Sequence, residues 1–193
     1  MSFGLMLLPV LGFAYCGGEA SSDQDAAAGQ ELAGPAKDAP ALVFLGDSLT
    51  AGRGLAKSQS APALIQAKLL EAGLEYRVVN AGRSGDTSAR GLGLGQRESN
   101  LKEIVKRTRE YDANIRVFLF QMHIFPNMGP EYQQGYEDVF RRVAKEMDIG
   151  LLPFPLLNVG GVPELNQDDG IHPNVEGTKI VAENIWGALQ GQL

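Results

Sequence analysis

From residue 41 onward, the chain alternates short apolar runs with segments of helical periodicity. The apolar runs cover residues 42–45, 76–79, 115–120 and 151–157. Helical patterns cover residues 62–72, 100–111, 131–148 and the segment from 174 onward. This alternation is typical of a parallel sheet with crossover helices, so we predict an α/β fold. Right-handed crossovers would bring the carboxyl ends of the strands to one edge, where open α/β sheets bind their ligands.

Length and charge exclude several classes of protein. With 193 residues, 44% of them hydrophobic, the chain is long enough for one well-buried domain and does not require two. A net charge of -6 and a pI near 5.0 disfavour binding to nucleic acid or to anionic lipid. Cys16 is the single cysteine, so no internal disulfide can form.

The first 40 residues differ in composition from the rest. Residues 5–15 are apolar but too short to span a bilayer, which indicates a signal-like export segment over 1–16. Residues 17–40 are rich in small and polar residues and predict a disordered tether, so the folded domain would cover 41–193. Cys16 lies where an exported bacterial lipoprotein carries its acylated cysteine.

Three alternatives remain for this segment: lipidation at Cys16, a plain cleaved export signal, or an uncleaved tail. The residues before Cys16 depart from a lipoprotein signal, and the amino end lacks Lys and Arg. We expect a bacterial protein that is exported, either free in the periplasm or anchored to a membrane as a lipoprotein.

Two short segments far apart in the sequence carry the chemistry. Gly46-Asp47-Ser48-Leu49 follows the first apolar run, and Asp169-Gly170-Ile171-His172 precedes the last helical segment. A serine, an imidazole and a carboxylate are the nucleophile, base and orienter that acyl transfer needs. Ser48 does not lie in the G-x-S-x-G elbow of α/β-hydrolases, and capping of the following helices is the structural alternative for both segments.

With these segments the chain resembles the GDSL esterase family, also called SGNH hydrolases, and especially its arylesterase, thioesterase I and lysophospholipase L1 branch. Residues 79–88, 126–132 and 152–155 also resemble blocks of that branch, in the same order. The resemblance implies a three-layer α/β/α flavodoxin-like fold and a catalytic triad of Ser48, His172 and Asp169. It also implies that the backbone N–H groups of Ser48 and Gly85 form the oxyanion hole, and that no cofactor is needed.

One block of the family has no counterpart here. No Gly-x-Asn-Asp tetrapeptide occurs in the chain, although in the family it follows a central strand and its Asn completes the oxyanion hole. We therefore expect four strands instead of five, with residues 42–45 beside 115–120. Asn80 and Asn127 are candidates to bind substrate in its place. The alternative to an active enzyme is an exported SGNH-like binding protein that is impaired or inactive.

The remaining candidate residues give weaker evidence of function. His123 follows the third apolar run and would line the substrate pocket or lie in a loop. Two histidines without clustered thiols or carboxylates give no zinc spacing, so we expect no metal. The Gly-rich segment 91–95 lacks the G-x-G-x-x-G spacing and predicts a loop.

The expected substrate is a small acyl ester, a thioester or a lysophospholipid, and the sequence does not choose among them. A membrane anchor at the amino end would favour the lysophospholipid. The oligomeric state is not predicted.

Overall fold

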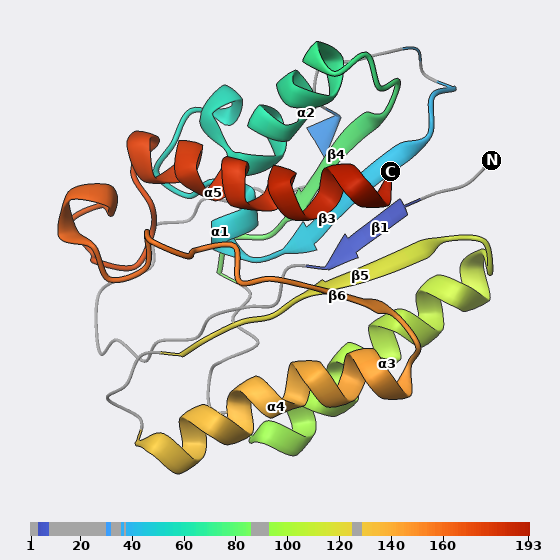
Figure 1. The fold of residues 1–193 in the computed structure, drawn as a ribbon, viewed down its shortest axis with the longest axis vertical. Coiled ribbons are helices and arrows are strands. Elements are labelled where there is room, and N and C mark those ends of the chain that lie inside the picture. The colour runs from blue at the N-terminus through green and yellow to red at the C-terminus, as the bar shows by residue number, and fades with distance from the viewer. Residues whose placement is uncertain (1–3, 8–29, 32–35, 37, 86–92, 125–128) are drawn as a thin grey trace.

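A six-stranded sheet with the order β2-β4-β3-β1-β5-β6 organises the chain (Figure 1). The structure, a computed structural model, describes residues 4–7, 30–31, 36, 38–85, 93–124 and 129–193. The strands are β1 (Gly4–Leu7), β2 (Gln30–Glu31), β3 (Ala41–Gly46), β4 (Arg77–Gly82), β5 (Arg116–Phe120) and β6 (Gly150–Leu152). All neighbours in the sheet are parallel except β2 and β4, which are antiparallel.

The helices follow the predicted alternation. They are α1 (Ser48–Ala51), α2 (Ala61–Glu71), α3 (Leu94–Tyr111), α4 (Pro130–Glu146) and α5 (Val175–Leu189), with short 3-10 helices at η1 (Lys57–Gln59), η3 (Pro163–Leu165) and η4 (Gln190–Gln192). Figure 1 shows α2 and α5 on one side of the sheet and α3 and α4 on the other. The α/β fold with a sandwiched parallel sheet is therefore confirmed.

The central strand comes from an unexpected part of the chain. β1 lies between β3 and β5 and pairs with both, Gly4 with Leu42 on one side and with Arg116 on the other. The expected arrangement, four strands with the first domain strand beside residues 115–120, is thus wrong. The expectation failed because β3 and β5 are not neighbours. Neighbouring strands lie about 4.8 Å apart, and β1 fills the position between β3 and β5 by pairing with both.

The last predicted strand is shorter than its apolar run. Residues 151–157 predicted one strand, but β6 ends at Leu152. Pro153 and Pro155 follow, and proline has no N–H to donate to a ladder of hydrogen bonds. The apolar residues beyond β6 therefore leave the sheet, and Leu156, which is 5% exposed, packs in the core from a turn.

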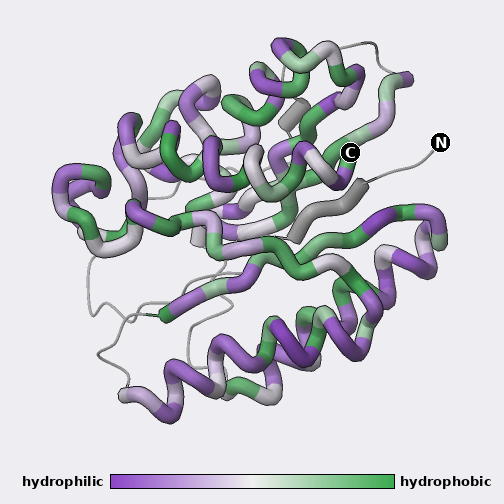
Figure 2. Tube along the Cα trace, viewed as in Figure 1, coloured by the Kyte–Doolittle hydropathy of each residue, from purple (hydrophilic) through white to green (hydrophobic). Residues whose placement is uncertain are grey.

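Apolar side chains of strands and helices form one continuous core. From the strands, Leu42, Phe44 and Leu119 are fully buried, and Ile65 of α2 and Val139 of α4 are fully buried on the helix side. Figure 2 shows the same division along α4, where hydrophobic and hydrophilic positions alternate with the turns of the helix. Burying one such side chain contributes about 1.5–3 kcal/mol, so packing on the sheet stabilises these helices more than their intrinsic propensity does.

Charged groups reinforce the contact between α3 and α4. The Glu98 carboxylate accepts hydrogen bonds from Lys102 at 2.8 Å and from Arg142 of α4 at 2.7 Å. The buried guanidinium of Arg97 lies 4.8 Å from the centre of the Tyr136 ring. These contacts hold together α3 and α4, which pack side by side on the same face of the sheet.

Within the described part of the chain, no helix is both long enough and apolar enough to cross a membrane.

The pairing of β1 gives a test that depends on the backbone alone. Proline at Met6 removes an N–H from a strand paired on both sides, so Met6→Pro should lower the free energy of unfolding by about 1–3 kcal/mol. Urea unfolding followed by circular dichroism measures the difference. The matched control is Met6→Ala, which keeps the N–H. Equal midpoints for the two variants would show that β1 is not part of the folded sheet.

Candidate active site

Ser48 is held at the carboxyl end of β3 by a single turn of helix. It is the first residue of α1, and the preceding Asp47 caps that helix, because its Oδ1 accepts a hydrogen bond from the Leu49 N–H at 2.9 Å. The turn ends at Gly52, whose φ of +76° lies in the left-handed region. This geometry presents the Ser48 hydroxyl at the edge of the sheet.

β4 holds α1 in place through Asn80 and Gly82. A Cβ on Gly82 would lie 2.3 Å from the Ala51 nitrogen, so only glycine permits this approach. The buried Asn80 amide donates to the Thr50 carbonyl at 3.0 Å and accepts from the Gly82 N–H at 2.9 Å. Asn80 therefore has a structural role in positioning the turn that carries Ser48, and its predicted role in binding substrate stays a prediction.

A tight turn before α5 positions the acid and the base. Asp169 Oδ1 accepts hydrogen bonds from the backbone N–H of Ile171 at 2.9 Å and of His172 at 3.0 Å. Gly170 has a φ of +67°, which lets the chain turn back within three residues. The alternative, in which Asp169 and His172 only cap the helix, does not hold for α5, because Asn174 caps it by accepting from the Gly177 N–H at 3.0 Å.

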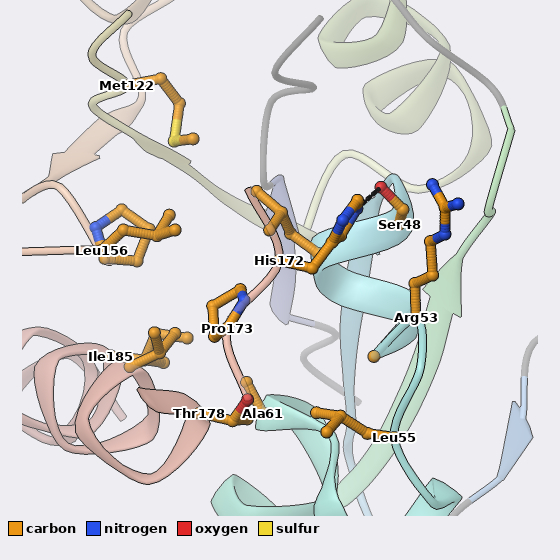
Figure 3. Close-up of a pocket in the computed structure, with 14 residues that line it drawn as sticks. Ser48, Arg53, Leu55, Ala61, Met122, Leu156, His172, Pro173, Thr178 and Ile185 are labelled. Atoms are coloured by element: carbon orange, nitrogen blue, oxygen red, sulfur yellow. Dashed lines mark hydrogen bonds between the residues drawn. The ribbon is translucent and has the colours of Figure 1, made fainter. Parts of the chain in front are cut away.

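The three predicted groups form one line of hydrogen bonds, of which Figure 3 shows the contact between Ser48 and His172. The His172 Nδ1 lies 2.6 Å from Asp169 Oδ2, and His172 Nε2 lies 2.8 Å from the Ser48 hydroxyl. With Nδ1 donating to the carboxylate, Nε2 is left to accept the hydroxyl proton. His172 is 6% exposed, which shields this line from competing water. The structure thus brings together Ser48, His172 and Asp169 in the order that a serine hydrolase uses.

Asp169 stays ionised in acid. Its partial burial alone would raise the pKa, but the backbone N–H groups of His172 and Ile171 and the His172 ring outweigh burial and lower the pKa to about 2. Above about pH 2 the ionised Asp169 keeps the His172 ring oriented and stabilises the imidazolium that forms when His172 takes a proton.

An apolar pocket opens beside this line of groups. Ser48 and His172 lie in its wall, and its free volume is about 30 Å³. Its apolar lining comes from α2, from α5 and from the segments that follow α1, β5 and β6, and includes Leu55, Ala61, Met122, Leu156, Val181 and Ile185. Such a lining suits hydrocarbon.

Other predicted residues lie in different surroundings. Gly85 follows β4 with a φ of +92°, next to the strand that precedes Ser48. Gly85 therefore lies at the same edge of the sheet as Ser48, and the predicted role of its N–H in the oxyanion hole stays a prediction. Asn127 and Cys16 fall outside the described residues, so their predicted roles stay predictions.

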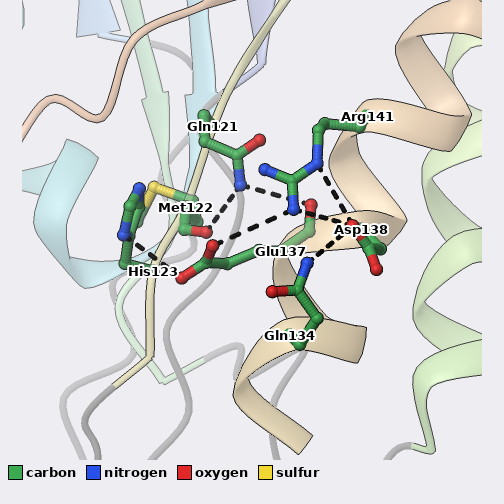
Figure 4. Close-up of polar contacts among 7 residues, drawn as sticks. All are labelled: Gln121, Met122, His123, Gln134, Glu137, Asp138 and Arg141. Carbon is green, nitrogen blue, oxygen red and sulfur yellow. Dashed lines mark hydrogen bonds and ion pairs between the residues drawn. The ribbon is translucent and has the colours of Figure 1, made fainter. Parts of the chain in front are cut away.

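His123 contacts α4 and does not line the pocket (Figure 4). Its Nδ1 lies 3.3 Å from the Glu137 carboxylate, and its ring packs against Phe154 with 4.5 Å between ring centres. Its neighbour Met122 points into the pocket instead. Among the two interpretations of His123, the contacts favour the loop histidine, and substrate binding by His123 stays a prediction.

Sequence reasoning missed most of the pocket. Met122 and Leu156 follow the ends of β5 and β6 and line the pocket. Leu156 belongs to an apolar run that predicted a strand, and Met122 was not singled out. Arg53, at the mouth of the pocket, was not singled out at all. Its position immediately after the glycine that ends α1 was the available signal.

Among the described residues, no group of three or more His, Cys, Asp or Glu side chains could hold a metal ion.

Comparison with known proteins agrees with this geometry. No protein-family profile matches the chain. The esterase TesA of Pseudomonas aeruginosa is 34% identical over 180 residues, which cover 79% of this chain and 89% of that protein. The chain belongs to the GDSL, or SGNH, hydrolase family. The thioesterase 1/protease 1/lysophospholipase L1 of Escherichia coli is also 34% identical, covering 80% of this chain and 84% of that protein.

Solved structures of SGNH hydrolases resemble the fold closely. A crystal structure of TesA matches with a TM-score of 0.74 at 34% identity, covering 79% of this chain and 99% of that one. The SGNH-hydrolase family esterase AlinE4 matches with a TM-score of 0.63 at 28% identity, covering 82% and 98%. The family identified from short sequence blocks is therefore confirmed over most of the domain.

The low pKa of Asp169 predicts how stability changes with acid. In the unfolded chain this carboxyl titrates near its ordinary value of 3.8, so ionised Asp169 stabilises the folded state fully above about pH 4. This contribution disappears as the pH falls toward 2. Asp169→Asn keeps the shape but lacks the charge. The difference in urea midpoint between wild type and Asp169→Asn should be constant at neutral pH and shrink below about pH 4. A difference independent of pH would contradict the assignment.

Proposed function

We propose that this GDSL-type ester hydrolase uses Ser48 as the nucleophile, His172 as the general base and Asp169 as the group that orients His172. The observation that carries the proposal is the unbroken line from the Ser48 hydroxyl through the imidazole to the carboxylate, with contacts of 2.8 and 2.6 Å. A serine hydroxyl is a weak nucleophile unless a base accepts its proton, and this line supplies that base.

The reaction proceeds in two steps at this site. Ser48 Oγ attacks the carbonyl carbon while His172 Nε2 takes the hydroxyl proton, and His172 then donates that proton to the leaving alcohol or thiol. A water molecule, deprotonated by the same nitrogen, attacks the acyl-enzyme and releases the carboxylic acid. The backbone N–H groups of Ser48 and Gly85 stabilise the oxyanion that forms in each step.

The missing Gly-x-Asn-Asp block predicts a slower enzyme. Loss of one oxyanion-hole donor typically lowers kcat by about 10²–10³-fold. We propose that two backbone donors and an intact triad leave measurable activity below that of relatives with the third donor. The alternative, a binding protein without activity, would need the triad to be idle, and the contact between Ser48 and His172 argues against it.

The pocket supports a short acyl group as the part of the substrate that enters the protein. Its lining is apolar next to Ser48, and its free volume of about 30 Å³ is about that of one water molecule, so an acyl chain of any length must extend toward the open mouth or widen the pocket. Relatives bear the names esterase, arylesterase and thioesterase/lysophospholipase. We propose carboxylic esters and thioesters with short acyl chains as substrates, with lysophospholipid-like esters among them.

The role of Ser48 can be tested directly. Ser48→Ala should lower kcat on p-nitrophenyl butyrate by about 10⁶-fold, because the remaining groups cannot form an acyl-enzyme. A fluorophosphonate probe should label wild type and not Ser48→Ala. The matched control is Ser58→Ala, which changes an exposed serine in η1 outside the pocket lining. Equal labelling of wild type and Ser48→Ala would contradict the proposal.

The acyl pocket has its own test. Ala61 lines the pocket, so Ala61→Leu should fill space that an acyl chain would occupy. The ratio of kcat/KM for p-nitrophenyl butyrate to that for p-nitrophenyl acetate should fall about tenfold or more. Ala72→Leu, at the end of α2 and outside the pocket, is the control. An unchanged ratio in Ala61→Leu would place the acyl chain elsewhere.

Location in the cell stays a prediction from the sequence. Cleavage at Cys16, with or without lipidation, would remove β1 from between β3 and β5, so the pairing of β1 supports the third alternative, an uncleaved amino end. Export to the periplasm and a membrane tether stay predictions. The mass of the protein isolated from its host distinguishes the three alternatives.

A further inference from the structure

The mouth of the pocket carries one cation that the hydrolytic mechanism does not use. Among the described residues that line the pocket, Arg53 has the only permanent charge. Its side chain is exposed, and within the described residues its guanidinium has no hydrogen bond or ion pair. Figure 3 shows Arg53 and His172 on either side of Ser48.

The backbone of Arg53 is fixed between the nucleophile and the base. Its N–H donates to the Ser48 carbonyl at 3.0 Å, which closes the turn that begins at Ser48. Its carbonyl accepts from Gln167 Nε2 at 2.8 Å, and the same amide donates to the Pro173 carbonyl beside His172 at 2.9 Å. Hydrogen bonds thus tie the backbone of Arg53 to Ser48 and, through Gln167, to the residue after His172. Because its backbone is fixed, its guanidinium can reach only the space near the triad.

We infer that Arg53 binds a phosphate or carboxylate on the leaving group of the substrate, within a few bonds of the scissile ester. The inference rests on the proposed function, in which the acyl chain fills the apolar pocket and leaves the alcohol at the mouth. A guanidinium donates two parallel hydrogen bonds to such an oxyanion. Because the chain has a net charge of -6, an anionic substrate has no general attraction to this protein and depends on a local cation.

Bond counts separate two sources of the anion. In a 1-acylglycerol 3-phosphate, about five bonds join the ester oxygen to phosphorus, which is within reach of an arginine one helical turn from the nucleophile. In an acyl-coenzyme A, more than about a dozen bonds separate the thioester from the nearest phosphate, so that phosphate lies beyond Arg53. The site therefore favours acylglycerol phosphates over neutral acylglycerols and gives no such advantage to coenzyme A esters.

The test compares two pairs of substrates that share a butyryl group. The first pair is 1-butyrylglycerol 3-phosphate and 1-butyrylglycerol, and the second is butyryl-coenzyme A and S-butyryl-N-acetylcysteamine. Arg53→Gln should lower the kcat/KM ratio of the first pair about three- to fivefold, mainly through KM, and leave the ratio of the second pair unchanged. Arg53→Lys should keep part of the preference. Arg107→Gln, an equal change of charge on α3, is the control.

Each other result overturns the inference. An equal loss of kcat/KM on all four substrates would show that Arg53 has a structural role. An unchanged kcat/KM ratio for the first pair would show that Arg53 does not bind the phosphate. A loss confined to the coenzyme A pair would place the anion elsewhere.

A binding measurement keeps the inference separate from catalysis. Calorimetry on Ser48→Ala and on Ser48→Ala with Arg53→Gln should show about three- to fivefold weaker binding of 1-butyrylglycerol 3-phosphate in the second protein. Equal affinities would overturn the role of Arg53 even if wild type hydrolyses esters. If wild type hydrolyses no ester but the two proteins still differ in affinity, the proposed function fails and the role of Arg53 in binding stands.

Discussion

The contact between α1 and β4 determines where the nucleophile lies. The chain passes from β3 into a single turn of helix, and that turn fits against the neighbouring strand only because Gly82 has no side chain. The amide of Asn80 then satisfies the Thr50 carbonyl, which would otherwise be a buried group without a partner. A short helix has little stability of its own, so these tertiary contacts are what hold Ser48 opposite His172.

The sequence predicted the catalytic line because its parts are local. Asp169 and His172 share one tight turn, and Ser48 follows a strand directly, so spacing and periodicity made them candidates. The resemblance to the GDSL family then implied their roles. The pocket could not be predicted in the same way, because side chains such as Met122 and Leu156 meet only after distant loops have folded. The one signal for Arg53 was its place after the glycine that ends α1, because the rest of its position depends on hydrogen bonds to Ser48 and Gln167.

The strands show the same limit of sequence reasoning. Residues 151–157 are apolar enough for a longer strand, yet the prolines at 153 and 155 end the ladder of hydrogen bonds. The prediction followed the apolar composition and gave these prolines too little weight. The segment 4–7 has the composition of an export signal, and nothing in its sequence distinguishes that use from a central strand of a sheet. Its role as a strand depends on the position between β3 and β5, which is a property of the whole sheet and is not encoded in residues 4–7 themselves.

A central strand taken from the amino end also affects the order of folding. β1 leaves the ribosome before β5, and Gly4 pairs with Arg116, which is synthesised 112 residues later. Contacts between such distant residues form slowly, because a long loop must close before they stabilise anything. Until β5 emerges, one edge of β1 remains unpaired, and unpaired apolar strands aggregate readily. Production of this enzyme should therefore depend on chaperones that shield β1 until β5 has been synthesised.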